Sequence, residues 1–388
     1  MKKSWLDELI KYNISMNNIQ CCVTQVNYLG EIIYECAKGF GTRDGRPVHK
    51  DTIFQVTSLT KPIIAALILL LFEDGKIHLD HLVGQYLSSF QHGAKSKIRI
   101  IDLLTHTSGL LDAYPEEFLR IYIRDTYQLE IPEILDELDD IQLSFFENMY
   151  LILGIRGKVN REDNPKRIWS HIHDTLIKKL PPYYATGTQF IYCNYGYNIL
   201  SQIITLVTNT CFESFAFERL LEPLGMSNTF WKVPESKFND VVKRYKPALA
   251  ANWLNSEAFM KRSTGYDGLK STVTDMMAFI EMIKNRGRHK NLQIFSEKSI
   301  YLFMTNHNQH LPKGSGRTVG FHIHDEKQDG LGSKRSQEAI DHGGMGGTQI
   351  MIDPKYGISI VFFAVDNKKT SINHYDQFVD NIYSYLKL

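Results

Sequence analysis

The sequence predicts an α+β fold: an antiparallel sheet flanked by helices, with a mostly helical domain inserted into it. Strand-like alternation of apolar and polar residues occurs near both ends of the 388-residue chain, whereas helical periodicity dominates the middle. We therefore expect residues 1–85 and 265–388 to form one discontinuous sheet domain. Residues 86–264 then form the inserted helical domain, and a chain of this length can bury the large core that this layout requires.

The individual elements follow from the spacing of apolar residues along the chain. Residues 5–18 have the spacing of an amphipathic helix, residues 63–72 form an unbroken apolar helix, and residues 374–386 form a final helix. Alternating apolar residues predict strands at 21–27, 31–37, 52–56, 318–324, 348–353 and 358–365. A Pro-Lys-Tyr-Gly turn joins the last two strands, which indicates a hairpin near the end of the chain.

Composition narrows the class of protein. The chain has 44 Lys and Arg against 43 Asp and Glu, so a general nucleic-acid or anionic-membrane surface is not expected. The five cysteines have no regular spacing, so they predict neither a disulfide framework nor a zinc site. The sequence also lacks a phosphate-binding glycine loop, so it gives no sign of a nucleotide cofactor. No apolar signal segment follows Met1, and the apolar run 63–72 is too short to cross a bilayer. We expect a cytoplasmic protein without membrane insertion or cofactor; the sequence does not indicate its oligomeric state.

The first chemical motif is Ser58-Leu59-Thr60-Lys61, at the start of the apolar helix. Residues three apart on a helix share a face, so the Ser58 hydroxyl and the Lys61 amine can meet. Pro62 is tolerated only near a helix start, which places Ser58 at or just before the first turn, where negative charge is favoured. A lysine beside the apolar run is partly desolvated, which makes the neutral amine, a competent base, more accessible. The alternative is that Ser58 caps the helix and Lys61 is a surface charge.

The same spacing recurs at Ser384-Tyr385-Leu386-Lys387, so spacing alone is a weak signal. That copy lies at the C-terminal end, where fraying disfavours a catalytic centre, and it lacks both apolar flanks. We therefore expect Ser58, and not Ser384, to be the nucleophile.

The second motif, Tyr192-Cys193-Asn194, lies between a turn-rich stretch and a predicted helix that includes residues 197–204. Loops that enter helices often carry functional groups. A phenol near an ammonium can give up and relay a proton, and the Asn194 amide offers a donor and an acceptor to a substrate or to Lys61. Cys193 is expected to point the other way, into the protein. The alternative is an aromatic-rich helix start that Asn194 caps.

The third motif, His342-Gly343-Gly344, opens a glycine-rich run that leads into the predicted strand 348–353. Glycines at a strand edge let a ligand or another backbone approach closely. The N–H of Met345 could then join the N–H of Ser58 as an oxyanion hole, and His342 could hydrogen-bond the substrate or the proton relay. The alternative is a glycine-rich turn without chemistry.

In this order the three motifs resemble those of the serine β-lactamase and penicillin-binding-protein superfamily. The closest likeness is to its class-C-like branch, with family VIII esterases, D-aminopeptidases and lovastatin-type acyltransferases. Segments 103–110, 223–226 and 268–275 also resemble recurring segments of that branch. The likeness covers roughly residues 20–388 and is weakest at 112–180.

The resemblance implies a β-lactamase-like fold and a role for single residues. Ser58 would be the acylated nucleophile, Lys61 its partner and Tyr192 the tyrosine base. Asn194 would contact the substrate. His342 stands where the family's lysine-threonine-glycine element has its lysine, and a neutral imidazole anchors a substrate carboxylate less well than an ammonium. Efficient penicillin hydrolysis is therefore not expected.

Other groups give weaker signals. His106 is expected to order a loop after the first helices. The two His-Ile-His triplets at 171–173 and 322–324 could each present two metal ligands on a strand, but no carboxylate or cysteine pattern completes a metal site. Aromatic residues between 114 and 150 could line an apolar acyl pocket. The absence of a Gly-x-Ser-x-Gly elbow argues against an α/β-hydrolase.

From the residues and the resemblance we expect a serine acyl hydrolase that acts on a small ester, amide or peptide through an acyl-enzyme on Ser58. Two alternatives stay open. The acyl group could pass to an acceptor alcohol or amine instead of water, which would make the protein an acyltransferase. The protein could also be catalytically silent and bind β-lactams or peptides in the same pocket.

Overall fold

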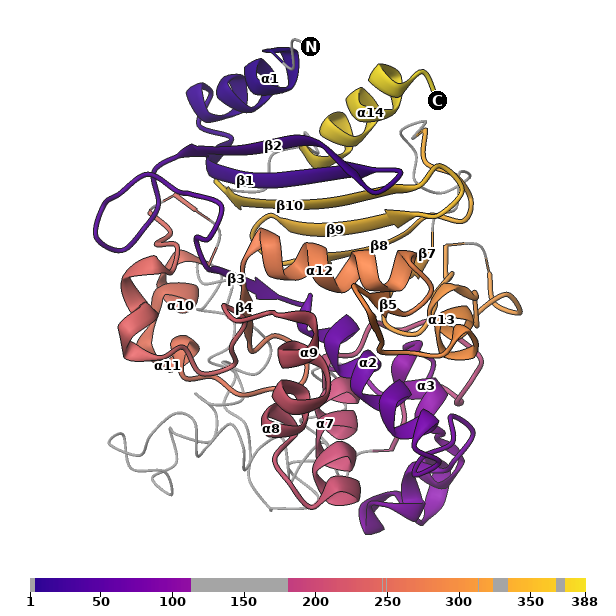
Figure 1. Ribbon diagram of the computed structural model, residues 1–388. Helices are drawn as coiled ribbons and strands as arrows, with labels where there is room; N and C mark the ends of the chain where they lie inside the picture. The colour runs from indigo at the N-terminus through magenta and orange to yellow at the C-terminus, as the bar shows by residue number, and fades with distance from the viewer. Residues whose placement is uncertain are drawn as a thin grey trace, which may run out of the picture.

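The computed structural model describes residues 4–112, 181–245, 247–248, 250–312, 314–323, 334–367 and 374–388. Its centre is an antiparallel sheet with the strand order β2-β1-β10-β9-β8-β7 (Figure 1). The strands are β1 (Ile19–Tyr28), β2 (Glu31–Gly39), β7 (His322–Ile323), β8 (Ile340–Gly344), β9 (Thr348–Asp353) and β10 (Ile358–Asp366). Because β1 pairs with β10, strands from both ends of the chain form one sheet, as the sequence predicts.

Helices cover both faces of this sheet (Figure 1). On one face, α1 (Ser4–Ser15) and α14 (His374–Leu386) share a buried apolar cluster with Cys22 of β1. On the other face, α12 (Val273–Lys284) belongs to the main core, which also contains Val23. Cys22 and Val23 enter different clusters because successive side chains of a strand point to opposite faces.

A second, two-stranded ladder does not pair with any strand of the main sheet. It pairs β3 (Phe54–Thr57) with β4 (Leu269–Ser271). The prediction of a strand at 52–56 is confirmed, but the expectation that it joins the sheet of the chain ends is wrong. Apolar alternation locates a strand and carries no information about its partner. β3 ends at Thr57 because the chain turns there into the next helix, α2 (Thr60–Glu73).

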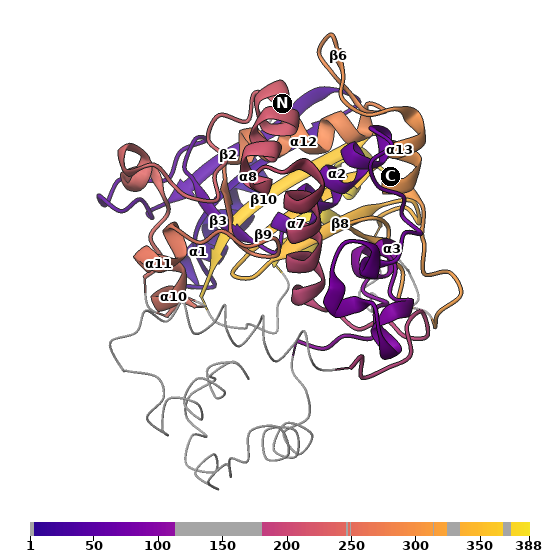
Figure 2. The same cartoon turned by 90° about the horizontal axis from the view of Figure 1, so that it is seen from below.

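The helix α2 runs through the core. It is buried from Thr60 to Leu71, which is the position expected of a helix that is apolar all round. Both α3 (Ile100–Leu104) and α7 (Asn194–Thr208) belong to the same core, and α7 packs against α2 and α3 (Figure 2). This packing brings the segment before α7 to the first turn of α2.

Short elements make up the rest of the described chain. The remaining helices are α8 (Phe212–Ala216), α9 (Glu222–Leu224), α10 (Ala251–Asn255), α11 (Glu257–Met260) and α13 (Glu297–Met304). A π-helical turn at Phe217–Leu221 joins α8 to α9, and 3₁₀ turns lie at Val83–Gln85, Ser88–Phe90, Gly93–Lys97 and Glu235–Asp240. β5 (Arg288–His289) and β6 (Leu292–Gln293) form a small hairpin.

Several expectations are refined or stay open. The strand predicted at 318–324 covers only His322 and Ile323 within the described residues, and β8 is an additional strand where the sequence indicated only a glycine-rich edge. The aromatic residues at 114–150 and the triplet at 171–173 lie outside the described residues. The domain boundaries and the cytoplasmic location stay predictions. In the described ranges, no helix is both long and apolar enough to cross a membrane.

Candidate active site

Ser58 lies in the tight turn between β3 and α2, two residues before the helix begins. The preceding residue, Thr57, has a φ of 44°, which is unusual for a β-branched side chain and costs conformational energy. The Thr60 hydroxyl holds this turn by donating to the Thr57 carbonyl at 2.6 Å. The turn presents Ser58 at the amino end of α2, where the helix dipole favours developing negative charge.

The predicted contact between Ser58 and Lys61 is present. Lys61 is fully buried, and its Nζ donates to Ser58 Oγ at 3.1 Å and to the carbonyl of Tyr266 at 3.2 Å. Lys61 is therefore not a surface charge. Two acceptors fix the amine beside the serine hydroxyl, within the reach that proton transfer requires.

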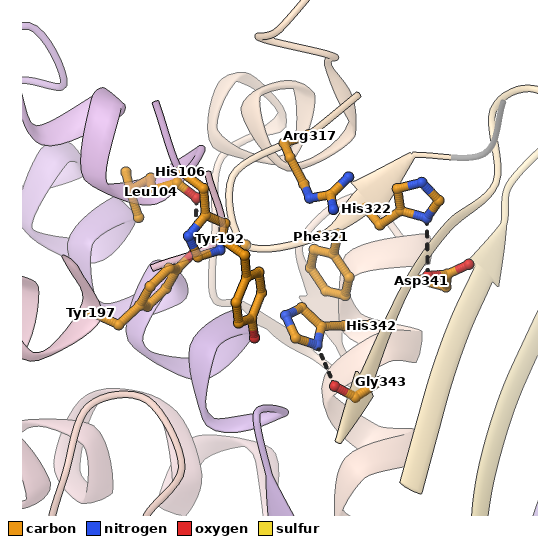
Figure 3. A pocket seen from close by; sticks show the side chains of 11 residues that line it. Leu104, His106, Tyr192, Tyr197, Arg317, Phe321, His322, Asp341, His342 and Gly343 are labelled. Carbon is orange, nitrogen blue, oxygen red and sulfur yellow. Dashed lines mark hydrogen bonds and ion pairs between the residues drawn. The ribbon is translucent and has the colours of Figure 1, made fainter. Parts of the chain in front are cut away.

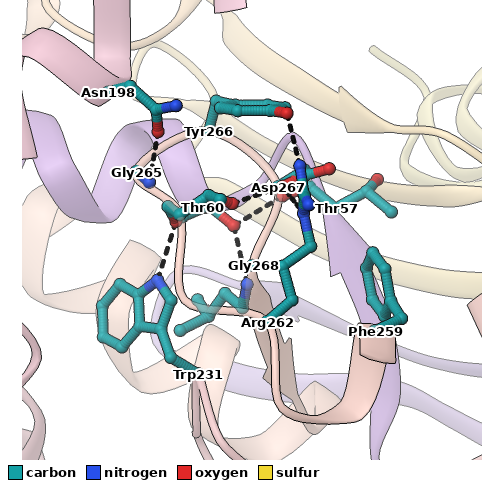
Figure 4. Close-up of polar contacts among 12 residues, drawn as sticks. Thr57, Thr60, Asn198, Trp231, Phe259, Arg262, Gly265, Tyr266, Asp267 and Gly268 are labelled. Atoms are coloured by element: carbon teal, nitrogen blue, oxygen red, sulfur yellow. Dashed lines mark hydrogen bonds and ion pairs between the residues drawn. The ribbon is translucent and has the colours of Figure 1, made fainter. Parts of the chain in front are cut away.

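The loop that supplies the Tyr266 carbonyl is braced by a network of polar contacts (Figure 4). Asp267 accepts from Arg262 Nε at 2.7 Å, and Gly265 donates to the Asn198 side chain at 3.0 Å. The Leu269 amide donates to the Thr60 hydroxyl at 3.0 Å, which ties the end of this loop to α2. This loop was not predicted as part of the site, because nothing in its local pattern indicates a contact with a lysine 205 residues away.

Tyr192 meets the lysine through its ring. The Lys61 Nζ lies 4.7 Å from the ring centroid, a cation–π distance. The Tyr192 side chain is 40% exposed, and its hydroxyl makes no hydrogen bond to Ser58 or Lys61 in the part of the chain that the structure describes. The structure thus links the predicted serine, lysine and tyrosine through Lys61, which contacts the other two.

His106 is a member of this site that the sequence placed only in a loop. Its buried imidazole stacks on the Tyr192 ring with centroids 4.4 Å apart, and its Nδ1 accepts from the Cys193 amide at 3.1 Å. Burial and the nearby Lys61 and Arg317 hold the pKa of His106 well below its usual value. A neutral imidazole whose Nδ1 is an acceptor carries its proton on Nε2. The only sequence signal for it is its place in the 103–110 segment of the family resemblance.

Asn194 is the first residue of α7, and its side chain does not cap the helix, so the alternative in which it is the cap is wrong. The carboxylate that caps this helix is Asp112, which accepts from the Asn194 amide at 2.8 Å and from the Tyr195 amide at 3.0 Å. Cys193 is buried, as predicted, and its thiol contacts Asp112 at 3.4 Å. The Asn194 side chain does not line the cavity described below, so its contact with a substrate stays a prediction.

The glycines of β8 allow this strand to lie against the nucleophile strand. A Cβ on Gly344 would lie 2.2 Å from the Val56 carbonyl oxygen, so only glycine fits there. The Thr57 hydroxyl donates to the Met345 carbonyl at 3.4 Å, which places Met345 beside Ser58. Within the described residues, neither the Ser58 amide nor the Met345 amide donates a backbone hydrogen bond. Both amides are therefore available as the predicted oxyanion donors.

His342 is held in one neutral form. Its Nδ1 lies 3.0 Å from the carbonyl oxygen of Gly343, and since a carbonyl only accepts, Nδ1 carries the proton. Burial and the charge of Lys61 lower the pKa of His342 to about 3. At neutral pH its Nε2 is thus a hydrogen-bond acceptor. The lysine ammonium that the superfamily named above has at this position is instead a charged donor.

A cavity of about 220 Å³ opens between these groups (Figure 3). Its wall is formed by Leu104, His106, Tyr192, Tyr197, Arg317, Gly320, Phe321, His322, Asp341, His342 and Gly343. The Asp341 carboxylate in this wall pairs with Arg335 at 2.9 Å and lies 3.4 Å from His322. No cluster of three metal-ligating side chains occurs among the described residues. Tyr192 and His342 belong to this wall, whereas Ser58, Lys61 and Met345 do not, so the cavity adjoins the candidate site through Tyr192 and the β8 strand.

The second Ser-x-x-Lys copy, at Ser384, does not lie at the buried start of a core helix. Ser384 is exposed on α14, and its hydroxyl donates to the Asp380 carbonyl at 2.7 Å. The helix α14 lies on the opposite side of the main sheet from α2 (Figure 1).

The fold and the buried serine–lysine pair define a serine hydrolase of the β-lactamase-related type. The Beta-lactamase family model matches residues 15–379, and the chain belongs to that family.

Individual relatives and structures agree. The chain is 26% identical over 380 residues to an N-acetylmuramyl-L-alanine amidase of Bacillus subtilis, covering 88% of this chain and 75% of that protein. It is 38% identical over 128 residues to esterase EstB of Burkholderia gladioli, covering 30% of this chain and 33% of the esterase. The structure of EstCE1, a hydrolase with promiscuous acyltransferase activity, superposes with a TM-score of 0.71 at 18% identity over 97% of each chain. A class C β-lactamase has the same TM-score at 20% identity, over 99% of this chain and 96% of that one. These structures share the fold.

Proposed function

We propose that this enzyme cleaves a small ester or amide through an acyl-enzyme on Ser58. The observation that carries the proposal is the 3.1 Å contact from Lys61 Nζ to Ser58 Oγ at a buried helix start. A serine hydroxyl is a weak nucleophile until a neighbouring base takes its proton, and Lys61 is the base within hydrogen-bond reach.

In the first step, the Lys61 amine, once it has given up its own proton, takes the Ser58 proton while Oγ bonds to the substrate carbonyl carbon. The carbonyl electron pair moves onto oxygen, and the amides of Ser58 and Met345 receive this oxyanion. Each such donor contributes about 10²–10³ in rate. When the tetrahedral intermediate collapses, the bond to the leaving group breaks, and the proton that Lys61 took from Ser58 passes to the leaving group directly or through Tyr192. Water then attacks the acyl carbon while Lys61 or Tyr192 takes its proton. The bond to Ser58 Oγ breaks, and Ser58 regains a proton as the acid is released.

Tyr192 is the proposed relay for the leaving-group proton. Its ring lies 4.7 Å from the Lys61 amine, and Tyr192 lines the cavity where a leaving group would lie (Figure 3). Catalytic hydrogen bonds in an empty site are often long and tighten when substrate binds. A small rotation of the phenol toward Ser58 would complete the relay.

The substrate class follows from the third motif. Because His342 is neutral and offers an acceptor, it suits a substrate N–H or O–H better than a carboxylate. We therefore favour esters and amides over penicillins as substrates. The cavity of about 220 Å³ limits the group beside His342 to a small one.

Intact-protein mass spectrometry with a fluorophosphonate and with a short-chain p-nitrophenyl ester tests the proposal. We expect one covalent adduct per chain, on the peptide that contains Ser58. The absence of both adduct and turnover would favour the silent binding protein instead.

Acyl transfer is the second candidate. Tyr192 and Met345, which flank Ser58, are 40% and 45% exposed, so an acceptor larger than water can reach the acyl-enzyme. The fold is also shared with a hydrolase that has promiscuous acyltransferase activity. Acceleration of p-nitrophenol release by an added alcohol, with formation of the new ester, would distinguish transfer from hydrolysis.

A further inference from the structure

Arg244 is a buried cation directly behind the turn that carries Met345. It is 1% exposed and is the largest fully buried side chain of the described residues. No role for Arg244 could be predicted from the sequence, because a single arginine outside a motif gives no functional signal.

The Arg244 guanidinium joins the two backbones that meet at Ser58. Its Nη1 donates to the Gly346 carbonyl at 2.9 Å, next to Met345, and its Nε donates to the Gln55 side chain on β3 at 3.4 Å. Gly346 has a φ of 93°, and a Cβ there would lie 2.4 Å from Arg244 Nη1, so the arginine and the turn fit closely. One side chain therefore spans from β3, which leads to Ser58, to the turn of Met345.

The arginine is itself held firmly. The Asn255 side chain accepts from the Arg244 amide at 3.0 Å and donates to the Arg244 carbonyl at 2.7 Å. Gln55 in turn donates to the Val242 carbonyl at 2.9 Å. These bonds leave the guanidinium little freedom, which is the condition for positioning another group.

The positive charge of Arg244 is poorly compensated. Within the described residues, no carboxylate forms an ion pair with it, and its Nη2 has no hydrogen-bond partner. Asp366 acts on it only through space, and burial lowers the pKa of Arg244 to about 10, so it stays charged at neutral pH. Burying a poorly compensated cation is unfavourable for folding. Such a cost is typical of functional sites, where destabilising features are retained for chemistry.

We propose that Arg244 is a positioning residue of the oxyanion hole: it fixes the Met345 turn against β3 and adds a buried positive charge behind it. The proposal rests on the proposed function, since it needs an oxyanion at Ser58. Negative charge develops on that oxygen only in the transition state, and a fixed cation in a water-poor interior stabilises it without reorganisation. Loss of Arg244 should therefore lower kcat more than it raises KM.

The test compares Arg244→Met, Arg244→Lys and the control Lys95→Met. Lys95 is another buried cation, 4% exposed, on a 3₁₀ turn that contributes nothing to the cavity wall. For each variant, kcat and KM for a p-nitrophenyl ester, the affinity for phenylboronic acid and the thermal unfolding temperature are measured. Phenylboronic acid bonds to the serine oxygen and becomes a tetrahedral anion, so it reports on the oxyanion site.

For Arg244→Met we expect kcat and phenylboronic acid affinity to fall together by about 10–100-fold, with KM changed less than about threefold. Arg244→Lys keeps the charge, but the lysine side chain is too short to reach both partners. On a logarithmic scale, its losses of kcat and of phenylboronic acid affinity should be about a third to a half of those of Arg244→Met. Lys95→Met should leave all three constants unchanged. If Arg244→Met does not fold, the Arg244→Lys variant decides by the same parallel loss.

Unchanged kcat and boronic acid affinity in a folded Arg244 variant would overturn the inference. So would a rise in KM without a fall in kcat, since that indicates a general loss of binding. Failure of the wild-type enzyme to react with the ester or with phenylboronic acid would instead contradict the proposed function, whatever the Arg244 variants do.

Discussion

The imidazole of His106 stacks on the ring of Tyr192, with 4.4 Å between the centroids and 29° between the planes. The same imidazole receives a hydrogen bond from the Cys193 amide, one residue further along. His106 thus fixes both the ring of Tyr192 and the backbone next to it. A phenol that must relay a proton benefits from this restraint, because small misplacements of catalytic groups cost rate steeply.

His106→Asn should separate the two contributions of the imidazole. His106 has a φ of 60°, which asparagine tolerates, and the asparagine oxygen can replace Nδ1 as acceptor. The stack on Tyr192 is lost. We expect a folded enzyme with kcat lowered about tenfold, less than the roughly 10²–10⁴-fold that an acid–base group contributes, because Tyr192 is misplaced and not removed. Ester kinetics measure the loss, and a wild-type kcat would show that the stack is incidental to catalysis.

Lys61→Met should abolish activity without unfolding the protein. The amine is the base in contact with Ser58, and removing one member of such a unit costs about 10³ or more in kcat. Replacing a buried charge by an apolar side chain of similar size is often neutral or stabilising. Urea unfolding should therefore give an unchanged or higher free energy of unfolding. A variant that keeps a tenth of the wild-type kcat would exclude Lys61 as the base.

Two neighbouring glycines of β8 provide a matched pair for the close approach of strands. A Cβ on Gly344 meets the backbone oxygen of Val56 at 2.2 Å, whereas one on Gly343 meets the flexible Gln349 side chain at 2.7 Å. Gly344→Ala should cost about 2–3 kcal/mol of stability, the upper range for overpacking, and displace the Met345 amide. Gly343→Ala should cost less than about 1 kcal/mol. Equal effects of the two substitutions on stability and kcat would argue against the close packing of β8 on β3.

Stability should fall as the pH drops below neutrality. Burial lowers the pKa values of His106 and His342 in the folded state, that of His342 to about 3. Below the unfolded pKa of about 6.5, the unfolded chain binds protons that the folded chain does not, so each histidine removes at most about 1.4 kcal/mol per pH unit. Urea unfolding at pH 7 and pH 5 measures this slope. His342→Gln should reduce this pH slope, whereas the control His92→Gln, at an exposed position, should not. A slope that His342→Gln leaves unaltered would contradict the buried neutral state of His342.

Much of the scaffold could be predicted from the sequence because its signals are local. The periodicities that define β1, β9, β10, α2 and α14 lie within single segments, and all five are present. The Ser58–Lys61 contact also follows from local helical spacing. By contrast, the partner of β3 is β4, more than 200 residues away, and no local pattern specifies it.

The groups that complete the site were missed for the same reason. His106, Asp112 and the Tyr266 carbonyl reach the motifs only through tertiary contacts, across 87, 82 and 205 residues of sequence. Each is an ordinary residue in its own segment, so residue type and spacing gave it no special weight. The motifs identified the nucleophile and its base, and the structure adds the residues that hold them in place.

The most direct test of the central claim is a paired substitution at the two Ser-x-x-Lys copies. Ser58→Ala and Ser384→Ala remove the same hydroxyl, one beside the buried Lys61 and one on the exposed end of α14. With a p-nitrophenyl ester as substrate, we predict that Ser58→Ala lowers kcat by at least about 10³ and that Ser384→Ala leaves it unchanged. Wild-type turnover by folded Ser58→Ala enzyme would contradict the account.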